Sequence, residues 1–313
     1  MLTYFIMNER IEQFLEKKFL RKPLKKIICL NRGGTSANYC LFDGKSYWLL
    51  KILDKNADNV RGHRFVNIYQ KLQKIKGLSV PKLIKTAEFE GCFLILMDFI
   101  QGKKLKPSDL SESVLAQIET NYRALSKADF IKDTFVNPSL IPSFFEKNNE
   151  SLIGEHSSQN FWVKFFLKRV EKYNHLIFQQ IPQIKKKKVV IHGDTGPNNF
   201  ILDDAGKIYF LDFEMIREGY LSEDLSQLVL SAVLQHAVWF FDKKLFLRCV
   251  VYFKKAFDLS YQDWVYGMCI YFLRLINRRL HSDKLLKSPR KSWLLLKHLQ
   301  KFEKVIGLLK TVY

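Results

Sequence analysis

The chain has 313 residues, 47% of them hydrophobic, with 51 basic against 31 acidic residues and a net charge of +20. This length can bury two modest cores but hardly three domains. No apolar run is long enough for a membrane span, and Glu9, Arg10 and Glu12 interrupt the core of any signal peptide. Five scattered cysteines, without paired metal spacing, indicate core thiols in a reducing cytoplasm.

Residues 8–19 have apolar side chains at helical spacing, which predicts a surface helix packed through one face. Residues 29–42 then have the pattern of strand, glycine turn and strand. Glycines let a backbone approach phosphate oxygens closely, and small hydroxyls can donate to them. The candidate phosphate-binding residues of this turn are Gly33, Gly34, Thr35 and Ser36. Taken alone, a glycine pair is more typical of a plain hairpin turn.

A third strand is predicted over residues 47–53, with Lys51 inside it. A lysine in this strand can reach across to nucleotide phosphates, although a lone strand lysine more often points to solvent. Residues 94–102 next predict a buried strand that ends in a turn. The order of these elements, ahead of the acidic loop described next, favours the phosphate-binding interpretation of Lys51 and the glycine turn.

Residues 189–202 contain two apolar, β-rich runs on either side of a polar segment with two glycines and a proline, which predicts a loop held between strands. In this loop His192 stands two residues before Asp194, and Asn199 stands five residues after it. A further predicted strand over 208–211 ends at Asp212, beside the same loop.

Phosphoryl transfer needs a carboxylate that orients the attacking hydroxyl and accepts its proton, and hard oxygen ligands that hold magnesium. The spacing His-x-Asp-x-x-x-x-Asn, followed after the next strand by Asp-Phe, is that of kinases. Asp194 is therefore the candidate catalytic base, and Asn199 and Asp212 are the candidate magnesium ligands. His-Gly-Asp alone is an ordinary turn sequence, but the complete motif in its strand context favours phosphoryl transfer.

The motifs at 191–202 and 211–214 resemble those of the aminoglycoside phosphotransferase and choline kinase family, and the resemblance extends from about residue 31 to 228. It implies an α+β, two-lobed protein kinase-like fold. The small lobe, 1–100, would contain an antiparallel sheet and bind nucleotide, and the large, mostly helical lobe, 101–313, would carry catalysis and substrate binding.

The same resemblance implies ATP and Mg²⁺ as cofactors, with Lys51 on the ATP phosphates. It implies a hinge between the lobes whose backbone meets adenine, at Asp98, Phe99 and Ile100. It also implies that Asp224, at the start of an apolar helix, braces the catalytic loop. A carboxylate at a helix N-terminus, favoured by the helix dipole, explains Asp224 equally well.

The sequence departs from the family at the partner of Lys51. The family pairs this lysine with a glutamate on the following helix, yet no glutamate lies between Lys51 and Glu88. The nearby polar substitutes are Asp58, Asn67 and Gln70. The ion pair is thus either missing or remade from elsewhere. Glu214, where protein kinases have glycine, is interpreted either as an ordering residue for the metal site or as a surface carboxylate.

The excess of positive charge is dense at 185–188 and from 284 to 310. It fits an anionic partner, such as a glycolipid, a phosphorylated sugar or a membrane surface, or simply a lysine-rich solvent face. A pI of about 9.6 is also one footprint of nucleic-acid binding, but no zinc, helix-turn-helix or RNA-binding signature accompanies it.

The last third of the chain is also rich in aromatic residues, which either bind sugars or lipid headgroups or fill the core. They are Trp264, Tyr266, Tyr271, Phe272 and Trp293.

The sequence thus predicts a cytoplasmic ATP-dependent kinase whose acceptor is a hydroxyl of a small molecule, of the amino alcohol, sugar or aminoglycoside type. One alternative is a kinase acting on an anionic glycolipid or lipopolysaccharide-core sugar at the inner face of the membrane. Another is a pseudokinase or basic nucleic-acid-binding protein without turnover. A basic pocket would suit a phosphorylated acceptor, whereas an acidic pocket for a cationic acceptor has candidates in Glu218, Glu223 and Asp263.

Overall fold

The computed structural model describes residues 9–32, 36–128, 186–234, 241–280 and 303–313, and the single positions 168, 171, 172, 175, 179, 184, 297, 300 and 301. The chain divides into two compact units, one of residues 1–103 and 201–214 and one of 104–200 and 215–313. The expected lobes, 1–100 and 101–313, differ from this division at 101–103 and at 201–214. The segment 201–214 groups with the first unit, and within it Phe210 donates its backbone N–H to Ser79 O at 2.9 Å.

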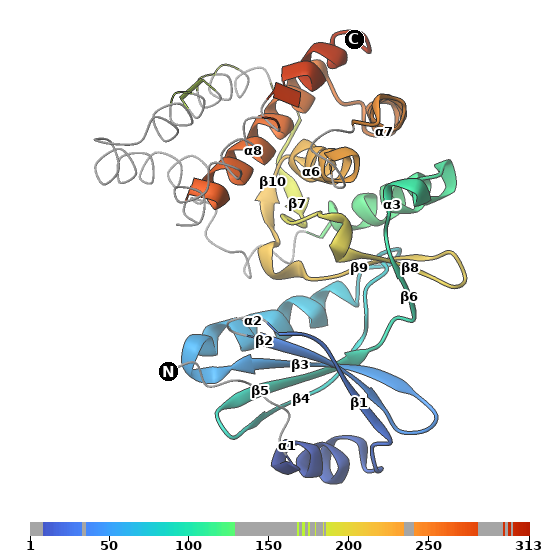
Figure 1. Ribbon diagram of the computed structural model, residues 1–313, viewed down its shortest axis with the longest axis vertical. Coiled ribbons are helices and arrows are strands. Elements are labelled where there is room, and N and C mark those ends of the chain that lie inside the picture. Colours follow the sequence, from blue (N-terminus) through green and yellow to red (C-terminus); the bar gives the residue numbers. More distant parts are fainter. Residues whose placement is uncertain are drawn as a thin grey trace. The chain divides into compact units, whose positions relative to one another are not determined.

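The first unit is built on a five-stranded antiparallel sheet of order β1-β2-β3-β5-β4 (Figure 1). Its strands are β1 (Lys26–Arg32), β2 (Ser36–Phe42), β3 (Tyr47–Asp54), β4 (Leu83–Phe89) and β5 (Cys92–Asp98). In the two central strands Lys51 of β3 pairs with Ile95 of β5. Because side chains alternate across a strand, Lys51 and Leu50 point to opposite faces of this sheet.

Helices cover both faces of the sheet (Figure 1). Helix α1 (Glu9–Phe14) continues as one π-helical stretch, Leu15–Leu20, and its apolar stripe packs on the face that includes Leu50. The predicted N-terminal helix is therefore confirmed. Helix α2 (Lys55–Leu72) covers the other face, where a Cβ on Gly62 would meet the ring of Phe93. Lys51 thus lies under α2.

Three short strands, β6 (Gly102–Lys104), β8 (Phe200–Asp203) and β9 (Ile208–Phe210), form a second sheet in the order β6-β8-β9. After β9, Asp212 adopts a left-handed backbone conformation, with φ of 58°, which aspartate tolerates better than most residues. The chain then makes a 3₁₀ turn, Phe213–Met215. This turn places the side chains of Asp212 and Glu214 next to β3.

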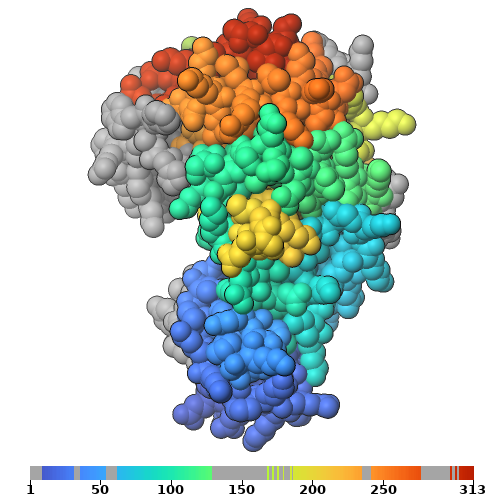
Figure 2. All heavy atoms as spheres, turned by 90° about the vertical axis from the view of Figure 1, so that its right-hand side faces the viewer, coloured from blue at the N-terminus to red at the C-terminus, as the bar shows by residue number. Residues whose placement is uncertain are grey.

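The second unit is mostly helical, with α3 (Glu112–Leu125), α6 (Leu221–Leu234), α7 (Lys243–Phe257) and α8 (Tyr261–Leu280). A two-stranded antiparallel sheet joins β7 (Val189–Ile191) to β10 (Arg217–Gly219). Helices α3 and α7 begin at capping side chains, Ser111 and Asp242, which each accept a backbone N–H of the first turn. On the face drawn in Figure 2, green α3 lies against orange α7, and Tyr252 donates its hydroxyl to Glu119 at 2.8 Å.

Helix α6 forms the centre of this unit, since every residue from 222 to 230 is buried. Helix α8 crosses it at Gly267, where a Cβ would collide with the carbonyl oxygen of Ser222. The aromatic residues of α8 belong largely to the core: Trp264 and Phe272 are fully buried and Tyr266 is 5% exposed. Trp293 lies outside the described residues.

All five cysteines are thiols outside any disulfide, and Cys29 on β1 is exposed whereas the other four are buried. Burial raises the pKa of the Cys249 and Cys269 thiols to about 12. Within the described part of the chain, no helix combines the length and the apolar character needed to span a bilayer. In the lysine run 185–188, which precedes β7, Lys186 forms an ion pair with Asp258 at 2.7 Å.

The close crossing of α6 and α8 gives a prediction for stability. We expect Gly267→Ala to lower the free energy of unfolding by about 1–3 kcal/mol, because the new methyl group forces the helices apart. Gly307→Ala is the matched control, since a Cβ at that helical position meets nothing within 4 Å. The control should be neutral or stabilise by up to about 1 kcal/mol. Equal effects of both changes in urea denaturation would contradict the packing argument.

Candidate active site

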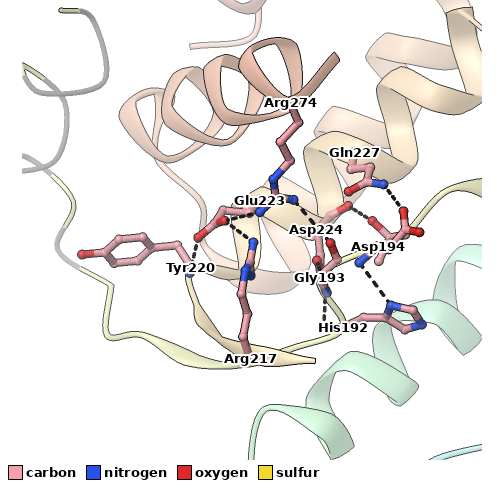
Figure 3. Close-up of polar contacts among 10 residues, drawn as sticks. His192, Gly193, Asp194, Arg217, Tyr220, Glu223, Asp224, Gln227 and Arg274 are labelled. Carbon is pink, nitrogen blue, oxygen red and sulfur yellow. Dashed lines mark hydrogen bonds and ion pairs between the residues drawn. The ribbon is translucent and has the colours of Figure 1, made fainter. Parts of the chain in front are cut away.

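The second unit holds Asp194 in the loop between β7 and a 3₁₀ turn, Pro197–Asn199. Its carboxylate accepts two hydrogen bonds, one on each oxygen (Figure 3 draws the first). Gln227 Nε2 of α6 donates to Oδ1 at 2.6 Å, and Asn199 Nδ2 donates to Oδ2 at 3.2 Å. The same Asn199 nitrogen also donates to the Asp194 carbonyl oxygen at 2.8 Å. The half-buried carboxylate is thus held in one orientation.

The loop itself is fixed by Asp224, a fully buried residue of α6. Its carboxylate accepts the backbone N–H of His192 at 2.7 Å and that of Gly193 at 2.9 Å (Figure 3). Thr195 donates its hydroxyl to the Asp224 carbonyl oxygen at 2.6 Å. Burial raises the pKa of Asp224, against the opposing effects of His192, Arg217 and the two N–H donors. The brace expected from the sequence is present.

Glycine is needed next to Asp194, at position 193. Gly193 has φ of +84°, and a Cβ there would run into the carbonyl oxygen of Met215. Any side chain would therefore be strained by the backbone angle and blocked by its neighbour. This explains why His192 and Asp194 are separated by glycine in this chain.

A buried charged cluster ties α6 to β10 and α8. Glu223 accepts from Arg217 Nη2 at 2.7 Å, from Arg274 Nη2 at 3.3 Å and from the backbone N–H of Tyr220 at 3.0 Å. Arg274 also donates to the Gly193 carbonyl oxygen at 3.4 Å. Burial, with the nearby Arg217, lowers the pKa of Arg274 to about 10. Helix α8 therefore contacts the loop that carries Asp194 directly.

Two carboxylates suggested for an acidic acceptor pocket serve the fold instead. Glu223 is 2% exposed and committed to the two arginines. Asp263 is 2% exposed and accepts the backbone N–H and hydroxyl of Ser260, both at 2.7 Å. The suggestion was wrong for both residues, because sequence alone did not reveal their burial. Glu218 is half-buried and stays a candidate.

In the first unit, Lys51 has acidic partners, although the described side chains of α2 include no acid. Lys51 Nζ lies 2.5 Å from Glu214 Oε1 and 3.6 Å from Asp212 Oδ1. The lysine is 8% exposed, so this charge is paired largely away from water. Of the helix substitutes considered, Asn67 and Gln70 are exposed, and the side chain of Asp58 lies outside the described residues. The ion pair is remade from the segment after β9.

The two candidate metal ligands offer suitable atoms. Both hydrogen bonds of Asn199 use its amide nitrogen, which leaves the amide oxygen as the atom for a cation. The side chain of Asp212 is 47% exposed, so its carboxylate can be reached from water. Magnesium binds through one or two protein oxygens together with phosphate and water oxygens, so this donor chemistry fits. Among the described residues, no group of three or more His, Cys, Asp or Glu side chains is arranged to hold a metal ion.

The candidate nucleotide-contacting residues are only partly described. Gly33, Gly34 and Thr35 lie outside the described residues, while Ser36 begins β2 opposite Leu53. Asp98, Phe99 and Ile100 follow the buried part of β5 and are half-buried, as expected where a strand runs out into a turn. The Asp98 N–H already donates to Lys82 O at 2.9 Å. Adenine binding at this turn stays a prediction.

Sequence reasoning missed Gln227 and underestimated Glu214. Both act through contacts between residues far apart in the chain: 33 positions separate Gln227 from Asp194, and 163 separate Glu214 from Lys51. For Glu214 the sequence did contain a signal: the helix after Lys51 has no glutamate, so an acidic partner for the lysine has to come from another segment. For Gln227 the only signal was its place three residues after Asp224, nearly one helical turn along the same face.

Residues 27–256 match the family model described as the phosphotransferase enzyme family. The chain belongs to this family. The match spans the sheet of the first unit, the loop that carries Asp194, helix α6 and most of α7, so it includes Lys51, Asp194, Asn199 and Asp212. No curated protein matches by sequence.

Solved phosphotransferase structures share the fold at low identity. A thermostable mutant of aminoglycoside phosphotransferase APH(4)-Ia is 16% identical, with a TM-score of 0.65, over 95% of this chain and 99% of that chain. ADP-bound APH(2'')-Ib is 14% identical, with a TM-score of 0.65, over 97% and 99%. Spectinomycin phosphotransferase APH(9)-Ia is 12% identical, with a TM-score of 0.63, over 97% and 98%. The protein kinase-like fold expected from the sequence is confirmed.

The Asp224 brace gives a second stability prediction. Asp224→Ala leaves two buried N–H groups without acceptors, so we expect the free energy of unfolding to fall by about 3 kcal/mol or more. The control is Asp242→Ala, which removes the helix cap of α7 and should cost about 1 kcal/mol. Chemical denaturation of both variants tests this, and a smaller loss for Asp224→Ala than for Asp242→Ala would contradict it.

Proposed function

We propose that this phosphotransferase transfers the γ-phosphoryl group of ATP to a hydroxyl of a small molecule in the cytoplasm. The observation that carries the proposal is the orientation of Asp194, whose two carboxylate oxygens are held by Gln227 and Asn199. A base held in this way needs little reorganisation when the acceptor arrives. The partnered Lys51 argues against the pseudokinase alternative, since the phosphate-binding lysine has kept its ion pair.

In the proposed reaction, Asp194 orients the acceptor hydroxyl and takes its proton as the oxygen attacks the γ-phosphorus. The bond between that phosphorus and the β,γ-bridging oxygen breaks, and ADP leaves. Lys51 holds the phosphates, and Ser36 with the preceding glycine turn covers them. Asn199 and Asp212 would bind Mg²⁺, which neutralises charge on the phosphate oxygens when bound.

Relatives in the fold support both the nucleotide and the type of acceptor. APH(4)-Ia has been solved in a ternary complex with AMP-PNP and hygromycin B, and APH(2'')-IIa in complex with gentamicin. Aminoglycosides, other amino sugars and amino alcohols are therefore the first acceptors to test. Anionic glycolipids and lipopolysaccharide-core sugars belong in the same panel, because the net charge of +20 suits an anionic acceptor.

The deciding experiment follows Mg²⁺-dependent ADP formation against this panel. We expect Asp194→Asn to lower kcat by about 100-fold or more, because the base is lost while the shape of the side chain is kept. Asp204→Asn is the control, as Asp204 is exposed in the turn between β8 and β9 and should leave turnover unchanged. Wild-type turnover in a folded Asp194→Asn variant would refute the proposed role.

A pH profile tests the contact between Gln227 and Asp194. Gln227→Glu places a second carboxylate beside Asp194, where the glutamine nitrogen now donates at 2.6 Å. Repulsion between like charges raises the pKa of a carboxyl group, so we expect the acidic limb of kcat/KM to move up by about one pH unit. Gln227→Leu removes the donor without adding charge and should lower kcat with a smaller shift of the profile. Superimposable profiles for wild type and Gln227→Glu would contradict the contact.

A further inference from the structure

The acidic partner of Lys51 lies on the segment that follows β9. The two oxygens near Lys51 Nζ differ in distance and in access to water: Glu214 Oε1 is at 2.5 Å with a side chain 19% exposed, and Asp212 Oδ1 is at 3.6 Å with a side chain 47% exposed. The closer, more shielded carboxylate makes the stronger pair, because water screens it less. Asp212 keeps the exposure that a metal ligand requires.

Helix α2 meets the same lysine with an aromatic ring. The ring centroid of Phe65, a residue 4% exposed, lies 4.6 Å from Lys51 Nζ, which is a cation–π contact. Phe65 therefore occupies the position on α2 from which a glutamate would reach the lysine. Since the ring carries no charge, this contact alone leaves the buried ammonium without a counter-ion, and Glu214 supplies it.

The segment that carries Glu214 is fastened to α2. Arg64 Nη2 donates to the Glu214 carbonyl oxygen at 3.1 Å, and Asp212 donates its backbone N–H to the Tyr69 hydroxyl at 3.1 Å. The Tyr69 ring stacks on Phe65, with centroids 4.5 Å apart, and meets Phe213 edge-on at 6.0 Å. These contacts all lie within the first unit and fix the Glu214 carboxylate relative to Lys51.

We propose that Glu214 is the positioning residue of Lys51, taking the place of the glutamate that kinase helices usually supply. It holds the ammonium group in the orientation that meets the nucleotide phosphates, while Asp212 remains the metal ligand. This inference rests on the proposed use of ATP. The competing role for Glu214 is direct binding of magnesium, and the two roles predict different responses to a change at Lys51.

A double-variant cycle separates these roles. We expect Glu214→Gln to lower kcat/KM for ATP by about tenfold, mainly through KM, and Lys51→Met by about 100-fold. Because Glu214 acts through Lys51, the double variant should be no worse than Lys51→Met within about twofold. Multiplied losses in the double variant, or recovery of Glu214→Gln by added Mg²⁺, would overturn the proposal in favour of metal binding.

A second experiment tests whether a carboxylate on α2 restores the activity that Glu214→Gln loses. Phe65→Glu combined with Glu214→Gln puts a carboxylate back on the helix, and we expect it to recover most of the lost kcat/KM. Gln70→Glu in the same background is the matched control, since it adds the same charge at an exposed position of α2 and should recover nothing. A folded double variant without recovery, or equal recovery by the control, would overturn the replacement of the helix glutamate.

Thermal unfolding of each variant verifies that it is folded. If Phe65→Glu does not fold, the double-variant cycle of Glu214→Gln with Lys51→Met by itself tests whether Glu214 positions Lys51. Nucleotide binding by wild type, followed with a fluorescent ATP analogue and Mg²⁺, tests the proposed function separately from the role of Glu214. Absence of binding would refute the proposed function itself. Binding and turnover by wild type together with unchanged kinetics for Glu214→Gln would refute this inference only.

Discussion

The second unit depends on one buried carboxylate. Asp224 accepts the backbone N–H groups of both His192 and Gly193, and these bonds set the path of the loop that carries Asp194. Burying a charge is costly unless it is hydrogen-bonded, and here the loop provides the donors. Nearly one turn further along α6, Gln227 then donates to the carboxylate of Asp194, the candidate base. A single helix, buried almost throughout, thereby supports the loop and orients the Asp194 carboxylate.

In the first unit the buried charge is an ammonium group, and its partner comes from a turn. Lys51 is buried beneath α2, and its charge is balanced by Glu214 rather than by a described side chain of the helix. Arg64 and Tyr69 connect α2 to the backbone of the same acidic segment. In kinases whose helix carries the glutamate, movement of the helix makes or breaks the pair. Here Glu214 and Asp212, the candidate metal ligand, belong to one short segment after β9, so these two carboxylates are positioned together.

Local pattern and motif spacing were enough to predict the elements that position the site. The interval between Asp194 and Asn199 and the strand around Lys51 follow from sequence because each depends on neighbours in the chain. The missing glutamate of α2 was visible too, but its replacement was not, since Glu214 approaches Lys51 only after the chain has folded. The roles of Glu223 and Asp263 depend on burial, which the sequence did not reveal. Both were expected to line an acidic acceptor pocket, whereas in the structure they accept hydrogen bonds inside the fold.

The distribution of thiols makes the protein convenient to label. Four of its five cysteines are inside the core, and Cys29 alone is exposed, four residues before the glycine pair that is proposed to cover the phosphates. A maleimide dye will therefore attach at one position without any prior removal of cysteines. Its emission would report on the strand leading into that turn, so nucleotide titrations can be read optically on the native sequence.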